Sequence, residues 1–256
     1  MQYAELVLRW IHIVAGVFWI GHLWFFNFVN ANFAPTMDGE TKKKVVPQLM
    51  PRALFWFRWG AAWTFVTGVF LAFLVYYHGY GGSNLVEGQQ QVTAMTWLPA
   101  FLGLIVGFLV YDLLFKALAK QHNVAVVLWG LCAVGFGIAL IEVLHFSQRA
   151  AYIHVGALFG TSMAANVWMR IWPAQKRIIM ATKEGRTPDP ADPALSGLRS
   201  KHNTYMSVPL LLFMLLPDQV GKVADIKPHF LIPAILVVAF GATWWLYGKA
   251  KKVPGF

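Results

Sequence analysis

The 256 residues are 58% hydrophobic and only 12% charged, about half the charged fraction of an ordinary soluble domain. This composition excludes a typical soluble domain and predicts an integral membrane protein. The net charge of +10 is distributed over alternate connections between apolar runs. Charge placed in this way sets membrane topology, so we expect no nucleic-acid partner and predict a multi-pass membrane protein.

Seven apolar runs approach or exceed the length that crosses a bilayer, for which about 18–20 residues suffice. We therefore predict an all-α integral membrane protein, a bundle of about seven transmembrane helices that forms a single domain over residues 1–256. The sixth run is short and is interrupted by Pro209. The predicted spans cover residues 4–30, 54–78, 97–119, 124–146, 149–172, 203–217 and 229–248.

Lysine and arginine residues concentrate in every second connection, starting with the one that follows the first span. Positive residues mark the cytoplasmic side of a membrane protein, which predicts an N-terminus outside and a C-terminus in the cytoplasm. The most basic connection lies between the fifth and sixth spans. Within it, the Pro- and Asp-rich segment 183–201 is predicted to be a surface connection.

His12 on the first span and His154 on the fifth are polar residues at membrane depth, where they are costly and usually functional. Both spans run from outside to inside, so the helical rise of about 1.5 Å per residue places the two imidazoles within one turn of the same depth. Such a pair can hold the iron of haem b from both faces. Gly16 leaves room for the macrocycle and Trp19 supplies an apolar wall. The alternative is two core histidines that hydrogen bond to backbone or water.

His22 lies ten residues beyond His12, about 15 Å deeper, and approaches the depth of His202 at the start of the sixth span. This arrangement leaves room for a second haem with His22 as an iron ligand, or for a polar substrate cavity.

Further polar residues fall towards the cytoplasmic half and, with His202, are predicted to line a pocket for a small planar anion. Each of them alone also suits a structural role, and an arginine near a span end also suits contact with lipid head groups. These residues are Asn27, Arg58, Asn166 and Asn203.

The most specific stretches of the sequence are RWIHIVAGVFWIG, PRALFWFRWGAAWTFVTG, FLVYDLLFKAL, HVGALFGTSMAANVWMRIWPAQKRIIMATKEGRTPDP and SKHNTYMSVPLLLFML. Together they resemble the transmembrane N-terminal region of the bacterial membrane-bound urate hydroxylase family. The resemblance implies oxidation of urate to 5-hydroxyisourate, with electrons passed to cytochrome c. It also implies roles for His12, His154, His202, Arg58, Trp59, Asn166 and Gln175.

Members of that family carry an additional span and a fused cytochrome c domain with a CxxCH motif. This sequence has a single cysteine, Cys132, so we expect electrons to pass to a separate cytochrome c or to respiratory-chain subunits. His22 also departs from the family motif.

The leading hypothesis is a haem-b membrane oxidoreductase of the urate hydroxylase type, in which His202 and Arg58 act on urate or a similar planar anion. The second hypothesis is a non-enzymatic haem-b electron-transfer or assembly subunit of a larger respiratory complex. The third is a small-solute transporter in which Asp112 and the histidines bind substrate or protons.

Overall fold

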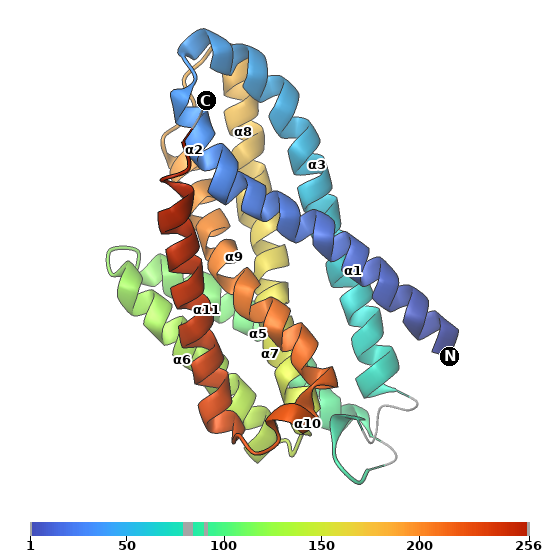
Figure 1. Ribbon diagram of the computed structural model, residues 1–256. Coiled ribbons are helices and arrows are strands. Elements are labelled where there is room, and N and C mark those ends of the chain that lie inside the picture. Colours follow the sequence, from blue (N-terminus) through green and yellow to red (C-terminus); the bar gives the residue numbers. More distant parts are fainter. Residues whose placement is uncertain (1, 79–83, 90–91, 255–256) are drawn as a thin grey trace. The chain divides into compact units, whose positions relative to one another are not determined.

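The computed structural model describes residues 2–78, 84–89 and 92–254, and the regular structure of these residues is helical throughout, with no strand (Figure 1). Several of the long helices continue into short turns of 3-10 or π geometry. The longer helices are α1 (Gln2–Trp24), α3 (Gly39–Ala72), α5 (Ala94–Ala117), α6 (His122–Glu142), α7 (Gln148–Asn166), α8 (Trp172–Lys183), α9 (Ala191–Leu215) and α11 (Pro228–Ala250). The short elements are η1 (Phe25–Asn30), α2 (Ala31–Phe33), η2 (Ala34–Thr36), η3 (Phe73–Tyr77), η4 (Val167–Ile171), η5 (Leu216–Asp218) and α10 (Val220–Val223).

Five of the predicted spans are confirmed as helical segments that are long and apolar enough to cross a membrane, which indicates a membrane protein. The predicted fifth and sixth spans are also helical, but they carry more polar residues and fall short of the same apolarity. Their crossing of the membrane stays a prediction. The five segments are Tyr3–Thr36, Gly39–Tyr77, Ala94–Ala117, His122–Glu142 and Pro228–Ala250.

The predicted surface connection at residues 183–201 is wrong over most of its length, because α9 begins at Ala191. Its prolines are compatible with the start of a helix, where a missing backbone N–H removes no hydrogen bond. The Asp189 carboxylate caps this end by accepting the N–H of Ala191 at 2.9 Å. Residues 191–201 of the predicted connection, about three turns, are therefore helical, and Arg199 within them is buried.

The chain separates into two compact units, each assembled from segments that are far apart in the sequence. Unit 1 comprises Met1–Arg9, Thr67–Ser162 and Val208–Phe240, and unit 2 comprises Trp10–Val66, Met163–Ser207 and Gly241–Phe256. The single domain predicted over the whole chain stays a prediction. All five polar residues of the predicted pocket fall in unit 2, whereas His154, the predicted haem ligand of the fifth span, falls in unit 1.

Helices of unit 1 pack closely at small residues, as the GxxxG pattern of Gly103 and Gly107 predicts. A Cβ atom at Gly103 would lie 2.8 Å from the ring of Phe136 on α6, and one at Gly107 would overlap Leu158 on α7. Figure 1 shows α5 and α6, the two green helices, as neighbours.

In unit 2, the backbones of α1 and α3 approach each other at Gly60. A Cβ atom at this position would lie 2.9 Å from the backbone nitrogen of Trp19 and 3.0 Å from the carbonyl oxygen of Ala15. Backbone atoms cannot move aside as a flexible side chain can, so this crossing requires glycine. The contact also buries Trp19, which is 2% exposed.

Candidate functional site

Among the residues that the structure describes, three π-helical turns continue long helices, and each coincides with a polar residue. Asn27 lies inside η1, Tyr77 ends η3, and Asn166 directly precedes η4. Such turns disturb the regular hydrogen-bond ladder and occur frequently at functional sites. Asn27 and Asn166 belong to unit 2 and Tyr77 to unit 1, so they define two separate clusters.

The first cluster is built on α9, whose N-terminal half carries polar side chains at helical spacing on a buried face. Ser196, Asn203, Thr204 and Ser207 are at most 1% exposed, and Arg199 is 3% exposed. We call the following residues the polar face of α9: Ser196, Arg199, Ser200, Asn203, Thr204 and Ser207.

Side chains of α7 and α8 bond to this face. The amide nitrogen of Asn166 donates to the amide oxygen of Asn203 at 2.9 Å, and Asn203 donates to the carbonyl oxygen of Met163 at 2.9 Å. On α8, the amide nitrogen of Gln175 donates to the hydroxyl of Ser196 at 3.1 Å. Asn166 and Asn203, two of the residues predicted to line a polar pocket, are thus hydrogen-bonded to each other, and their contact with a substrate stays a prediction.

Side chains of α1, η1 and α11 reach the same face. Asn27 donates to the Ser200 hydroxyl at 2.8 Å and accepts a hydrogen bond from the Tyr247 hydroxyl at 2.9 Å. The indole N–H of Trp24 donates to the Ser207 hydroxyl at 2.9 Å. The polar face of α9 is therefore the common hydrogen-bonding surface of several helices in unit 2.

Arg199 is the functional candidate that the sequence analysis missed, because it was counted among the charges of a cytoplasmic loop. Burial of a charged guanidinium costs free energy unless the charge is compensated, which makes Arg199 a functional candidate. His202, one turn later on α9, is also buried, at 7% exposed. The spacing of Arg199, His202 and Asn203 at i, i+3 and i+4 was the available signal, because such residues share one helical face.

A cavity of about 260 Å³ opens beside the polar face, near the start of α9. Ser196 lines one wall, Gln175 and Asn30 contribute further polar groups, and most of the remaining lining is apolar. Arg199 follows Ser196 by one helical turn on the same face of α9. A concave, mostly apolar site with a few converging polar groups is the usual form of a small-molecule binding site.

Arg58 lies among aromatic rings. Its guanidinium carbon is 3.9 Å from the ring centroid of Trp172, and its carbonyl oxygen accepts the indole N–H of Trp168 at 3.1 Å. Trp59 packs edge-on against Trp168, with 5.5 Å between ring centroids. These described contacts are cation–π and backbone contacts, and the predicted action of Arg58 on substrate stays a prediction.

The predicted haem residues of the first span lie on α1 in unit 2, where Gly16 and Trp19 face α3. His12 and His22 are half-buried, and the Nδ1 atom of His22 lies 2.7 Å from the carbonyl oxygen one turn earlier. That contact makes Nδ1 the protonated nitrogen, because a carbonyl only accepts. His154 belongs to unit 1, so the pairing of His12 with His154 stays a prediction.

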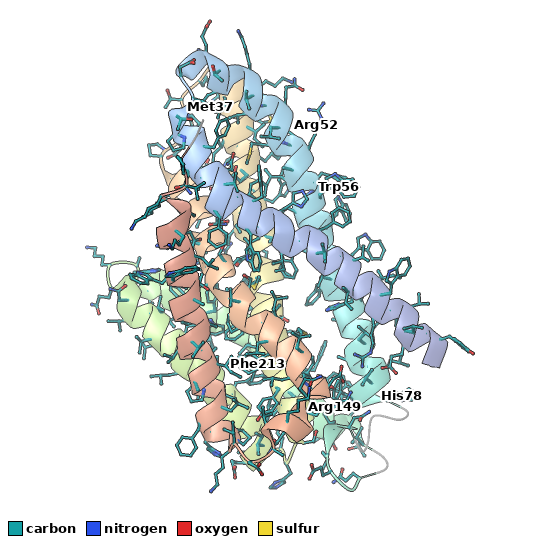
Figure 2. All side chains as sticks on the ribbon, in the orientation of Figure 1. Met37, Arg52, Trp56, His78, Arg149 and Phe213 are labelled. Atoms are coloured by element: carbon teal, nitrogen blue, oxygen red, sulfur yellow. The ribbon has the colours of Figure 1, made fainter. Side chains whose placement is uncertain are left out.

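The second cluster joins Tyr77 and His154 within unit 1. Nδ1 of His154 lies 2.7 Å from the carbonyl oxygen of Ala150, which makes Nδ1 the protonated ring nitrogen. Nε2 therefore carries the lone pair and accepts the hydroxyl proton of Tyr77 at 2.5 Å. Figure 2 shows His78, next to Tyr77 in the chain, and Arg149, at the start of α7, at the same end of unit 1.

This geometry bears directly on the predicted haem. A metal-binding histidine commonly donates its other ring N–H to a backbone carbonyl, as His154 does to Ala150. The ligating nitrogen would then be Nε2, but Tyr77 occupies that position and is itself only 3% exposed. Nε2 of His154 is therefore not open to a haem iron, and a haem that bound there would have to displace Tyr77.

Comparison with known proteins shows the family of the chain. The family model described as urate oxidase N-terminal matches residues 37–252. The chain belongs to the urate oxidase N-terminal family. The range matched by this family includes Tyr77, His154 and the whole polar face of α9, whereas His12 and Asn27 precede it. No curated protein and no solved structure matches the chain.

Proposed function

We propose that the protein binds urate or a similar planar anion in the cavity beside the polar face of α9 and oxidises it. The observation that carries this proposal is the buried Arg199, one turn from Ser196 in the cavity wall. A guanidinium is a planar fork of N–H donors that suits a planar anion. The family of the chain independently favours a urate-related function.

The amides around the cavity suit the same ligand. Urate presents both N–H donors and carbonyl acceptors at its edges, and Asn and Gln side chains carry one group of each kind. Gln175 and Asn30 line the cavity, and the buried pair Asn166–Asn203 lies further along α9. In this proposal His202 takes up a proton from the bound anion, the usual task of a histidine in such reactions.

The test is urate-dependent reduction of added cytochrome c by membranes that contain the protein. Arg199→Gln removes the proposed anion partner and leaves a side chain of similar length. Loss of a hydrogen bond to a charged group costs about 1.5–3 kcal/mol. The apparent affinity for urate should therefore fall by roughly tenfold or more. Arg199→Lys, which keeps the charge without the planar fork, should restore it only in part.

Arg186→Gln is the matched control, because Arg186 is exposed and lies in the connection before α9. It should leave the urate dependence unchanged. A urate-induced rise in melting temperature measures binding separately from electron transfer. The proposal fails if urate neither raises the melting temperature nor supports reduction of cytochrome c. It also fails if Arg199→Gln and Arg186→Gln have the same apparent affinity for urate.

We propose that the electrons pass to a separate cytochrome c. The predicted haem b, with His12 and His154 as ligands, would require Tyr77 to leave Nε2 of His154. Because Tyr77 covers Nε2 of His154, the absorption spectrum decides this point. Reduced-minus-oxidised bands of b-type haem that disappear in His12→Ala or His154→Ala would support the ligands. A colourless protein after expression with adequate haem would exclude them.

We also propose that residues 149–172, from α7 to the start of α8, and residues 203–217, from the second half of α9 into η5, complete a bundle of seven spans in a bacterial inner membrane, with the N-terminus outside. The alternating positive charge of the connections supports this orientation. Fusion of a fluorescent or an export-dependent enzyme reporter to the C-terminus tests it. A C-terminal reporter that is active only outside the cytoplasm would contradict the orientation.

A further inference from the structure

We propose that Gln175 selects the substrate by accepting a ring N–H of the ligand with its amide oxygen. The cavity beside the polar face of α9 then takes purine-type lactams that keep this N–H, and it rejects the same compounds when that nitrogen is methylated. The inference rests on the proposed function, because it places the urate-like ligand in that cavity. It adds a rule for which planar anions are accepted.

The first argument is the fixed orientation of the Gln175 amide. The hydroxyl oxygen of Ser196 lies 2.9 Å from the carbonyl oxygen of Asp192. A carbonyl can only accept, so the single hydroxyl proton of Ser196 is used in that bond. Ser196 must then accept from Gln175, whose amide nitrogen lies 3.1 Å from the hydroxyl oxygen. A flipped amide would bring two acceptor oxygens together, so the nitrogen of the amide faces α9.

The second argument is the atom that remains for a ligand. Gln175 lines the cavity, and its Oε1 atom accepts no hydrogen bond from the residues that the structure describes. Most of the surrounding cavity wall is apolar and cannot donate one. An amide oxygen in such surroundings is stabilised when it accepts a hydrogen bond. An N–H of the bound ligand supplies that bond.

The third argument is that the amide is held in place. Ser196, its partner, is 1% exposed. Two residues after Gln175, the Nε atom of Arg177 lies 3.0 Å from both carboxylate oxygens of Asp192. Two links thus join α8 to the first turns of α9. An acceptor that cannot turn away discriminates between ligands, because no rearrangement replaces a hydrogen bond that a ligand fails to make.

Urate suits this test of the site because it carries several ring N–H groups. Methylation of the nitrogen that meets Oε1 removes the donor and presses a methyl group against an unsatisfied oxygen. A site built to hydrogen bond a substrate N–H rejects an analogue that lacks it far more strongly than an apolar pocket rejects an added methylene. Methylation of a ring nitrogen that faces apolar wall has a smaller effect.

The experiment compares urate with its mono-N-methyl derivatives, in which each ring nitrogen is methylated in turn. The apparent Kd of the purified full-length protein for each compound is obtained from the ligand-induced rise in melting temperature. We expect at least one methylurate to bind roughly tenfold to a hundredfold more weakly than urate. This comparison needs no substitution, so it does not depend on the folding of a variant.

Gln175→Met keeps the length of the side chain and removes the acceptor. It should weaken the binding of urate by a similar factor and leave the binding of the rejected methylurate unchanged. Ser196→Ala frees the amide to turn, so the ratio between the two Kd values should fall although Gln175 is intact. Gln121→Met is the matched control, because Gln121 is an exposed glutamine in unit 1. This variant should keep the ratio.

Two results would overturn the inference while urate binding itself stands. One is that the unsubstituted protein binds every methylurate as tightly as urate. The other is that Gln175→Met weakens urate and the rejected methylurate by the same factor, which would mean that Gln175 only shapes the cavity. If urate does not bind the unsubstituted protein at all, the proposed function fails, and the inference about Gln175 fails with it.

Discussion

Asn166 and Asn203 form a hydrogen bond that ties the end of α7 to the middle of α9. Both side chains are 0% exposed, and the amide nitrogen of Asn166 lies 2.9 Å from the amide oxygen of Asn203. Asn203 in turn donates to the carbonyl oxygen of Met163, one turn before Asn166. The pair is thus anchored to the α7 backbone just before π turn η4.

Replacing Asn203 by alanine should destabilise the protein, because it leaves a buried amide donor of Asn166 without its acceptor. Leaving a buried polar group unsatisfied costs about 1–3 kcal/mol. Thermal unfolding in detergent, followed by circular dichroism, measures the change. Asn32→Ala is the control, since Asn32 is an exposed asparagine that bonds only one turn back along its own segment. Equal decreases in melting temperature for Asn203→Ala and Asn32→Ala would show that the buried pair contributes no more stability than an exposed asparagine.

Gly60→Ala should also destabilise the protein, because the added Cβ would press on backbone atoms of Trp19 and Ala15. Overpacking of this kind typically costs about 1–3 kcal/mol. Gly21→Ala on α1 is the control, because nothing lies within 4 Å of a Cβ there. Alanine is a better helix former than glycine by about 1 kcal/mol, so the control should be neutral or stabilising. Opposite signs of the two changes in melting temperature are the expected result.

The contact between Arg58 and Trp172 can be tested by a double-mutant cycle. Cation–π contacts contribute about 0.5–2 kcal/mol, depending on how far they are desolvated. Arg58→Gln and Trp172→Leu should each lower stability, and the double variant should lose less than the sum of the two. Strict additivity would mean that the two side chains do not interact. If Arg58→Gln abolishes urate oxidation while Trp172→Leu does not, Arg58 acts on substrate as the sequence predicts.

Of the seven spans that hydropathy predicted, five are confirmed as helices long and apolar enough to cross a membrane, because a run of apolar side chains can be recognised without knowledge of its neighbours in space. The polar half of α9 was not recognised as a helix, because its polar side chains form a buried face only when the neighbouring helices are present. Its prolines and aspartates favour a loop when considered alone, yet an aspartate and a proline also begin helices. Arg199 became a candidate only when α9 was seen to bury it.

The residues of the candidate site also divide into those that the sequence identified and those that it did not. The sequence identified Asn27, Asn166 and Asn203 as intramembrane polar groups, and all three are buried in unit 2. It also identified His154, but not its partner. Tyr77 lies 77 residues earlier, and no local spacing relates the two positions. Tyrosine is common near the end of an apolar span. Only the packing of η3 against α7 therefore reveals that Tyr77 bonds to His154.

The ion pair between Arg177 and Asp192 should make stability depend on pH. Nε of Arg177 lies 3.0 Å from both carboxylate oxygens, and these bonds hold the pKa of Asp192 below its ordinary value of 3.8. The folded state then binds this proton less readily than the unfolded state, so the contribution of the pair is complete above pH 3.8 and is lost as the pH falls through the lowered pKa.

Asp192→Asn removes that contribution at neutral pH. The melting temperature of the variant should therefore lie below that of the unsubstituted protein at neutral pH, and the gap should close as the pH falls below 3.8. Asp225→Asn, at an exposed position outside the pair, should show no gap at either pH. A gap for Asp192→Asn that persisted in acid would mean that the variant acts through packing at the start of α9, since the protonated carboxyl can no longer form the ion pair.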